Sequence, residues 1–218
     1  MRQSSPPISK NLRDIKKIIE FTRDEKRVLF ALNTPIKIQD YLNTLPKNFE
    51  HSGITLRSPR RVLLVKEAHC IEGALLAALA LWYHGEHPFL LDLVSTDYDF
   101  DHVVTLFKVD GHWGAISKTN HIVLRYREPV YKSVRELAMS YFHEYFLDNG
   151  KKTLRAYSNP FDLSLLPDTS WVTSTQDLWW LSEALDKSIH HKILTPFMIR
   201  RLRLADKIER QAGKLHEW

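Results

Sequence analysis

The chain has one cysteine, Cys70, and it stands where a thiol can do chemistry. It lies in the first turn of an apolar segment, residues 68–83, whose alanines and leucines predict a helix that is buried on all sides. Unpaired backbone amides and the helix dipole favour negative charge at such a position, so a thiol there ionises readily. Cysteine beside alanine is also a common small core residue, so a nucleophilic role requires a base nearby.

His102 is the best placed of the 11 histidines to act as that base. It follows a polar segment, residues 95–101, and opens a run whose apolar character predicts a strand over residues 102–108. A histidine at the end of a loop can also simply pack or be solvated. The sequence therefore makes His102 a candidate that needs a partner to orient its ring.

The hairpin that follows His102 supplies two candidates for the orienting residue. Asp110-Gly111 is typical of a two-residue β-turn, because a type I′ turn needs positive φ at both central positions. In that register Ser117 shares the face of His102. A bulge at Gly114 would shift the strand by one residue and place Asn120 on that face instead. Both candidates remain open.

The order of these residues resembles that of the transglutaminase-like superfamily of papain-type folds. That superfamily has a cysteine at the start of a buried helix, a histidine that opens a strand, and a partner strand that contains tryptophan. The matching segments are Ala-His-Cys-Ile-Glu-Gly-Ala at 68–74, Asp-His-Val-Val at 101–104 and His-Trp-Gly-Ala-Ile-Ser at 112–117. A helix predicted over residues 38–45 matches the helix before the cysteine, and the resemblance covers roughly residues 36–130.

The resemblance implies acyl transfer through a thioester. Cys70 would attack the carbonyl of an amide in a protein or peptide substrate, with its own backbone N–H as the oxyanion donor. His102 would act as general acid and base, and water or an amine would resolve the thioester. Hydrolysis, amine transfer and deamidation share this intermediate, so the sequence does not separate them. No cofactor and no metal ion is expected in this reaction.

Ser117 departs from the superfamily pattern, which carries an aspartate four positions after the hairpin tryptophan. A hydroxyl can accept a hydrogen bond from imidazole but cannot stabilise imidazolium as a carboxylate does. Either Ser117 or Asn120 orients His102 in a working enzyme, or the site is inactive. In the second case the protein would be a transglutaminase-like scaffold for protein interaction, with aromatic clusters at residues 141–146 and 179–180 lining the partner groove. The ordinary role of such clusters is core packing.

Periodicity predicts helices towards both ends of the chain and an antiparallel sheet after the buried helix. Predicted helices span residues 11–32 (one or two helices), 36–45, 68–83, 134–146, 177–188 and 196–215, and predicted strands span 88–94, 102–108, 112–117, 122–126 and 153–157. Residues 62–65 are predicted as a turn or strand. This order is typical of the α+β class. We expect a flexible segment at residues 1–10 and one transglutaminase-like domain over residues 11–218 with a C-terminal helical extension.

The net charge of +5 is distributed in a way that argues against nucleic-acid binding. Residues 1–61 hold 13 Lys and Arg against 6 Asp and Glu, whereas residues 62–149 hold 7 against 12. This pattern favours solvated helix faces over a basic stripe that would bind phosphate. Residues 196–215 are also basic, but Asp206 and Glu209 interrupt the run, and the apolar spacing predicts a helix that docks on the core.

Other classes of function lack the residues that they need. The chain has no Gly-x-x-x-x-Gly-Lys or Gly-x-Gly-x-x-Gly motif for a nucleotide, and the histidines between residues 69 and 121 show no metal-ligand spacing. No apolar run of about 18 residues predicts a membrane span, and no secretory signal opens the chain, so we expect a cytoplasmic protein without membrane contact. One cysteine excludes an internal disulfide. The oligomeric state is left open.

Overall fold

The computed structural model describes residues 12–51 and 53–217, so the predicted flexible segment at residues 1–10 lies outside the described residues. The α-helices are α1 (Ile15–Ile18), α2 (Arg23–Ala31), α3 (Pro35–Thr44), α4 (Pro59–Val65), α5 (Cys70–Tyr83), α6 (Val134–Ser140), α7 (Trp179–Asp186), α8 (Pro196–Ile199) and α9 (Lys207–Gly213). The strands are β1 (Phe89–Val94), β2 (His102–Val109), β3 (His112–Ile116), β4 (Arg127–Tyr131), β5 (Ala156–Ser158), β6 (Phe161–Asp162) and β7 (His190–Lys192). Single turns of 3-10 helix lie at Leu163–Leu165 and Ser170–Val172.

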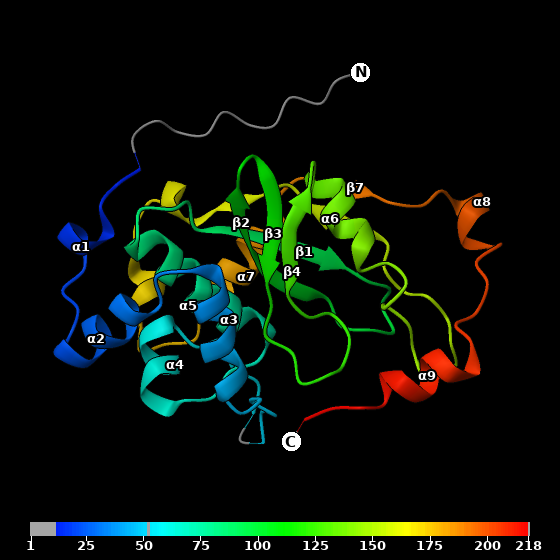
Figure 1. The fold of residues 1–218 in the computed structure, drawn as a ribbon, viewed down its shortest axis with the longest axis horizontal. Coiled ribbons are helices and arrows are strands. Elements are labelled where there is room, and N and C mark those ends of the chain that lie inside the picture. Colours follow the sequence, from blue (N-terminus) through cyan, green and yellow to red (C-terminus); the bar gives the residue numbers. More distant parts are fainter. Residues whose placement is uncertain (1–11, 52, 218) are drawn as a thin grey trace.

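The strands form one antiparallel sheet in the order β4-β3-β2-β1-β5-β7, with the short β6 beside β1. Helices α1 to α5 gather at one side of the sheet, and α6 lies against β3 and β4 (Figure 1). Two buried clusters result: α5 and its neighbouring helices build one, and the sheet and α6 build the other. The predicted α+β class is confirmed, with the helix that begins at Cys70 packed on an antiparallel sheet and further helices towards both ends.

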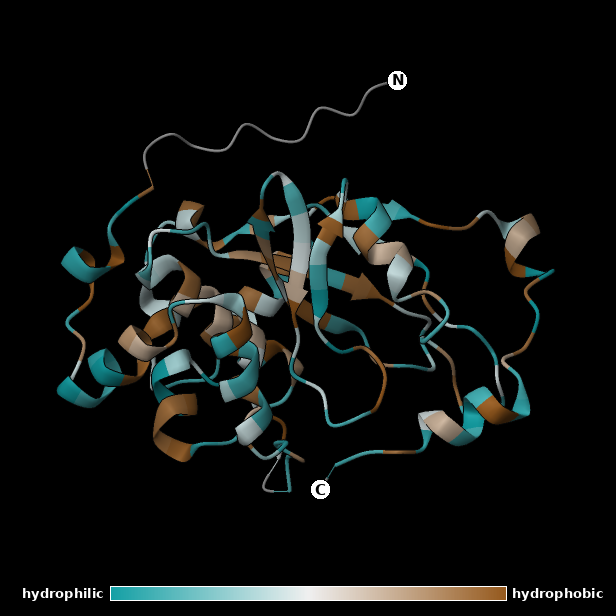
Figure 2. Ribbon diagram, in the orientation of Figure 1, coloured by the Kyte–Doolittle hydropathy of each residue, from teal (hydrophilic) through white to brown (hydrophobic). Residues whose placement is uncertain are grey.

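Helix α5 is the centre of the larger cluster because its sequence has no polar face. Every residue from Ile71 to Tyr83 is buried, whereas α2 at the periphery is mostly hydrophilic (Figure 2). Small side chains let β2 approach the helix, and Thr105 Oγ1 of β2 donates a hydrogen bond of 2.6 Å to the Ala74 carbonyl. The helix ends just before Gly85, whose φ of +90° favours glycine. The predicted buried helix is confirmed.

The β2–β3 hairpin has the predicted register. Residues 110–111 both have positive φ, and Thr105 pairs with Ile116 without a bulge between the two strands. The irregularity near Gly114 lies instead between β3 and β4. A Cβ atom on Gly114 would lie 2.8 Å from the Arg127 carbonyl oxygen of β4, so this glycine allows the two backbones to approach closely.

Two local predictions near the site are wrong. Residues 62–65 are not a turn or strand but the end of α4, which Ser58 caps and Pro59 begins. A serine followed by proline before an apolar run is a helix-start pattern, and it decides the conformation here. Residues 122–126 form a loop, because Leu124 has a φ of +60°, which a strand does not accommodate, and β4 begins at Arg127.

The predicted helix over residues 196–215 is broken into α8 and α9. Asp206 and Glu209 account for the break, because the Asp206 N–H donates to Glu209 Oε2 at 2.5 Å in a capping box that starts a new helix. Neither α8 nor α9 contains a buried residue, and Phe197, Leu204 and Ile208 of the predicted apolar face are exposed. Between the two helices, Ala205 is buried and Leu202 packs against the sheet cluster, so the predicted docking on the core holds only in part. Among the described residues, no helix combines the length and the apolar character needed to cross a membrane.

Candidate active site

Cys70 is the first residue of α5, and backbone contacts to a distant loop hold the chain in front of it. The Asn48 N–H donates to the Ala68 carbonyl, and the Ala68 N–H donates to the Pro46 carbonyl, each at 3.2 Å. These bonds fix the chain two residues before the helix begins. The half-buried Cys70 lines a cleft of about 910 Å³, and His102 lines the same cleft.

His102 opens β2, and its imidazole acts on the Cys70 thiol at the cleft, where it lowers the pKa of that thiol. Its Nε2 lies 2.8 Å from Ser117 Oγ. Ser117 Oγ donates its own proton to the Leu124 carbonyl at 2.5 Å, so it accepts the hydrogen bond from His102. This network assigns the tautomer with the proton on Nε2, which leaves Nδ1 free to take a proton from the thiol.

Ser117 is held in place through its backbone by a buried side chain of α3. Gln39 Nε2 donates to the Ser117 carbonyl at 2.8 Å, and the Ser117 N–H donates to Gln39 Oε1 at 2.9 Å. Ser117 is also the residue that the unbroken hairpin register predicts beside His102. The structure therefore brings three of the predicted site residues, Cys70, His102 and Ser117, together in one cluster.

Asn120 lines the cleft but does not orient His102. Its Nδ2 donates to the Glu217 carbonyl at 3.2 Å, and the Glu217 N–H donates to the Asn120 carbonyl at 2.7 Å. Its Oδ1 is buried and makes no hydrogen bond within the described residues. The alternative in which Asn120 orients the imidazole is wrong, because β2 and β3 pair without the bulge that it requires.

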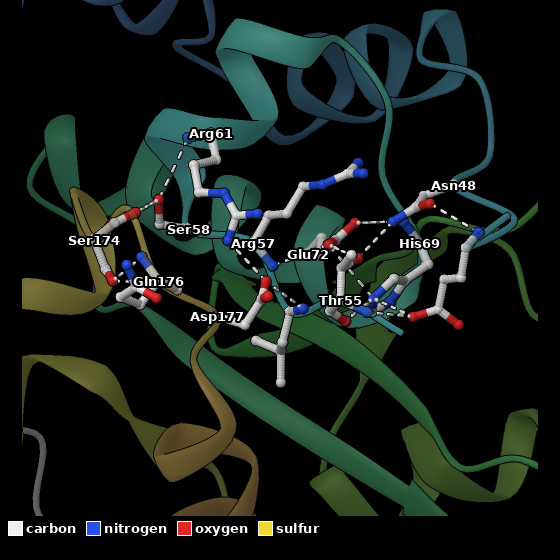
Figure 3. Close-up of polar contacts among 12 residues, drawn as sticks. Asn48, Thr55, Arg57, Ser58, Arg61, His69, Glu72, Ser174, Gln176 and Asp177 are labelled. Carbon is white, nitrogen blue, oxygen red and sulfur yellow. Dashed lines mark hydrogen bonds and ion pairs between the residues drawn. The ribbon is translucent and has the colours of Figure 1, made fainter. Parts of the chain in front are cut away.

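Sequence reasoning does not single out His69, yet this histidine also lines the cleft beside Cys70, and its imidazole lowers the pKa of that thiol. Its Nε2 lies 2.9 Å from the Thr55 carbonyl oxygen and 3.5 Å from Oε1 of the fully buried Glu72. Figure 3 shows His69 and Glu72 together with Asn48 and Thr55. The available signal was the spacing of His69 and Glu72, three residues apart as in a helix capping box.

The two imidazoles and the thiol change one another's protonation. Burial by itself would raise the pKa of the Cys70 thiol, but hydrogen bonds and positive charge from His102 and His69 hold this pKa well below its ordinary value. Burial by itself would lower the pKa of His69, but the hydrogen bond to Cys70 and the negative charges of Cys70 and Glu72 raise it to about 9. The arrangement thus favours a thiolate beside an imidazolium at neutral pH.

The rim of the cleft carries exposed aromatic side chains. Phe100 is 90% exposed and lines the cleft together with Phe49 and Phe146. The backbone that carries Phe100 is anchored, because Tyr145 Oη donates a hydrogen bond of 2.5 Å to the Phe100 carbonyl. An exposed aromatic ring on a fixed loop is a suitable contact for an apolar part of a substrate.

The aromatic clusters identified in the sequence divide between core and surface. Tyr141, Phe142 and Tyr145 are buried in the cluster that the sheet and α6 build, Tyr145 and Phe146 line the cleft, and Trp179 and Trp180 are 43% and 42% exposed at the start of α7. Tyr141 and Phe142 therefore pack the core, whereas Tyr145 and Phe146 are at the cleft.

The histidines of the central region are dispersed over the fold. His84 Nε2 lies 2.8 Å from the Leu29 carbonyl oxygen, and His87 Nδ1 lies 3.0 Å from Asp162 Oδ2, both near the end of α5 opposite Cys70. Within residues 12–51 and 53–217, no group of three or more His, Cys, Asp or Glu side chains is arranged to hold a metal ion.

Comparison with known proteins adds no family to these observations. A scan against protein-family models found no match, and a search of curated proteins found none either. The function of the cluster around Cys70 is therefore argued from its residues and their geometry.

Proposed function

We propose that this protein is a cysteine-dependent enzyme that takes an acyl group from an amide of a protein or peptide and transfers it to water or to an amine. One observation carries the proposal. The imidazole of His102 shares an open cleft with the Cys70 thiol, whose pKa it lowers, and its Nε2 lies 2.8 Å from the Ser117 hydroxyl. A nucleophile, a base and an orienting group in this order are what thioester chemistry requires.

The reaction uses these groups in two stages. The Cys70 thiolate attacks the carbonyl carbon, a C–S bond forms, and the electron pair of the carbonyl moves to its oxygen. The backbone N–H of Cys70, at the start of α5, stabilises this oxyanion. The C–N bond then breaks, and His102 gives a proton to the leaving nitrogen. His102 next removes a proton from water or an amine, which attacks the thioester and releases Cys70.

The fold-level resemblance supports the same proposal. A transglutaminase-like domain places its cysteine at the start of a helix packed on an antiparallel sheet, and α5 on β2 has that arrangement. The cleft is open, and its aromatic rim suits the side chains of a protein or peptide substrate. The catalytic steps proposed here need no cofactor.

Acylation by a small activated ester tests the proposal. Incubation with p-nitrophenyl acetate is expected to place one acetyl group on Cys70, seen as a mass increase of the intact chain, and then to turn over. Because the chain has one cysteine, Cys70→Ala removes every thioester and is the matched blank. Added hydroxylamine is expected to accelerate release of the acetyl group, as it does for a thioester.

An acetyl group that never forms on Cys70, or that forms no faster than on the unfolded chain, would contradict the proposal. That result would favour the inactive scaffold, in which the cluster only packs. If the thioester forms, the rates of release in water and in a primary amine then separate hydrolysis from amine transfer.

Ser117→Ala is expected to lower turnover by about tenfold to a hundredfold, because the loss of one buried hydrogen bond of about 1–3 kcal/mol leaves the His102 ring unoriented. Steady-state kinetics with the activated ester measure this, and the fall is expected in kcat. Ser158→Ala is a matched control, because its Oγ accepts a hydrogen bond of 2.9 Å from the Asp92 N–H away from the cleft. Equal losses in the two variants would contradict an orienting role for Ser117.

A further inference from the structure

The imidazoles of His69 and His102, which both act on the Cys70 thiol, have different neighbours at Nε2. Nε2 of His102 faces the uncharged hydroxyl of Ser117 at 2.8 Å. Nε2 of His69 lies 3.5 Å from Glu72 Oε1 and 3.8 Å from Glu50 Oε1, besides its contact with the Thr55 carbonyl. A carboxylate stabilises imidazolium and a hydroxyl does not, so a lasting positive charge belongs on His69.

The surroundings of the Glu72 side chain suit an ionised carboxylate. It is fully buried, and every hydrogen bond to it comes from a donor: Asn48 Nδ2 at 3.1 Å, Thr55 Oγ1 at 2.8 Å, the Arg57 N–H at 2.9 Å and the His69 N–H at 3.1 Å. An ionised carboxylate accepts hydrogen bonds only, so four donors match that form. Figure 3 shows Glu72 inside this shell of donors.

The buried charge of Glu72 needs a cation, and among the described residues the one that contacts it is His69. The guanidinium of Arg57, whose backbone also binds Glu72, is directed to Glu67 at 2.8 Å, and that of Arg61 to Asp177 at 2.7 Å. A buried carboxylate without a positive partner is strongly destabilising. The ion pair between His69 and Glu72 therefore satisfies both the carboxylate and the imidazole.

We propose that His69, paired with the buried carboxylate of Glu72, is the charged imidazolium that keeps Cys70 as a thiolate, and that His102 is the imidazole that moves the proton. This division of roles rests on the proposed use of Cys70 as the nucleophile. It also accounts for a serine at position 117. The carboxylate of the site, Glu72, contacts His69 and not His102.

Each proton has a defined place in this arrangement. His102 takes the proton of the thiol and gives it to the leaving nitrogen when the C–N bond breaks. His69 keeps its proton throughout and stabilises the sulfur when it is negative, before attack and again when the thioester is broken. Because His69 lines the cleft beside Cys70 and its charge acts on the reacting sulfur, we regard it as a catalytic residue, and Glu72 as a positioning residue that acts through it.

The experiment is a titration of the thiol, which needs no substrate. The ultraviolet absorbance of the thiolate and the rate of alkylation by iodoacetamide are measured against pH, with Cys70→Ala as the blank. The variants are His69→Gln, whose amide can still donate to the Thr55 carbonyl, and Glu72→Gln. His87→Asn is the matched control, because it removes another imidazole from a carboxylate, that of Asp162 at 3.0 Å, away from Cys70.

His69→Gln is expected to alkylate at least about tenfold more slowly than the wild type near pH 6, which corresponds to about one pKa unit of the thiol. Glu72→Gln is expected to change the rate in the same direction, and His87→Asn is expected to leave it unchanged. His102→Asn is expected to keep most of the thiolate, because His69 remains. The proposal is overturned if His69→Gln alkylates like the wild type while His102→Asn loses the thiolate.

A measurement on the wild-type protein keeps the test decisive even if a variant does not fold. With histidine labelled by ¹⁵N, one imidazole is expected to carry protons on both nitrogens near pH 8 and to change its signal when Cys70 is alkylated, since an unperturbed histidine titrates near about pH 6.5. No such imidazole would overturn the proposal. A thiolate that depends on His69 in a protein that forms no thioester would instead support the role of His69 and refute the proposed function, and with it the role of His102.

Discussion

His102→Asn is expected to lower turnover of an acyl substrate by about a hundredfold to ten-thousandfold, which is the usual contribution of a general acid and base. Asparagine can keep a hydrogen bond to Ser117 but cannot exchange a proton with the thiol or with the leaving nitrogen. We expect the loss in kcat, because both acylation and deacylation need that proton. Steady-state and single-turnover kinetics with the activated ester measure the two stages separately.

The control for this substitution is His112→Asn at the tip of the same hairpin, where Nδ1 only faces the Asp110 carbonyl oxygen at 3.0 Å. It tests whether loss of any histidine near the sheet disturbs the enzyme. Wild-type turnover in His102→Asn would mean that another group is the base. If His69 carries the positive charge, substitutions of the two histidines have different effects. His102→Asn removes turnover and keeps the thiolate, whereas His69→Gln removes the thiolate.

Gly73→Ala is expected to destabilise the fold by about 1–3 kcal/mol, the usual cost of overpacking, and to lower turnover as well. A Cβ atom at this position in α5 would press on the side chain of Lys118, 2.9 Å from its Cγ. Lys118 cannot move aside easily, because it is buried and its Nζ donates to the Leu45 carbonyl at 2.5 Å. Displacing Lys118 displaces Ser117, its neighbour in the chain, and with it the hydrogen bond to His102.

Two measurements check this expectation. Chemical denaturation gives the free energy of unfolding, and ester kinetics give kcat. The double variant Gly73→Ala, Lys118→Gly removes the clashing carbon atoms, so the two substitutions are expected to be less damaging together than their separate effects predict. Additive effects would show that the contact between Gly73 and Lys118 does not limit the approach of the hairpin to α5. Alanine stabilises a helix by about 0.5–1 kcal/mol relative to glycine. Any net loss of unfolding free energy in Gly73→Ala is therefore the cost of the clash minus this gain.

The rival interpretation as an inactive scaffold has less support from the contacts than from the sequence. Its sequence argument was the serine in place of an aspartate, which leaves His102 without a carboxylate. The tertiary structure supplies a carboxylate at the other imidazole, through Glu72 and His69. The thioester experiment decides between the two interpretations.

The sequence alone determined the parts of this protein that local rules govern. Continuous apolar residues over 71–83 are enough to specify a buried helix, and an Asp-Gly turn specifies the register that sets Ser117 beside His102. Local rules also determined Cys70 at a helix start. Where two local patterns competed, as in residues 62–65 and 196–215, helix caps at Ser58 and Asp206 decided the outcome.

Only the tertiary structure decided how the thiol is charged. Glu72 meets Asn48, which is 24 residues away in the chain, and Thr55, which is 17 residues away, because residues 46–51 and 53–57 lie against the start of α5. No periodicity or motif in the sequence reports such a contact, since it depends on how a loop closes in space. Periodicity and spacing therefore pointed to the proposed nucleophile and its proposed base. His69 and Glu72 are close to Cys70 in the chain, but only long-range contacts from Asn48, Thr55 and Arg57 bury the carboxylate and hold it beside the second imidazole.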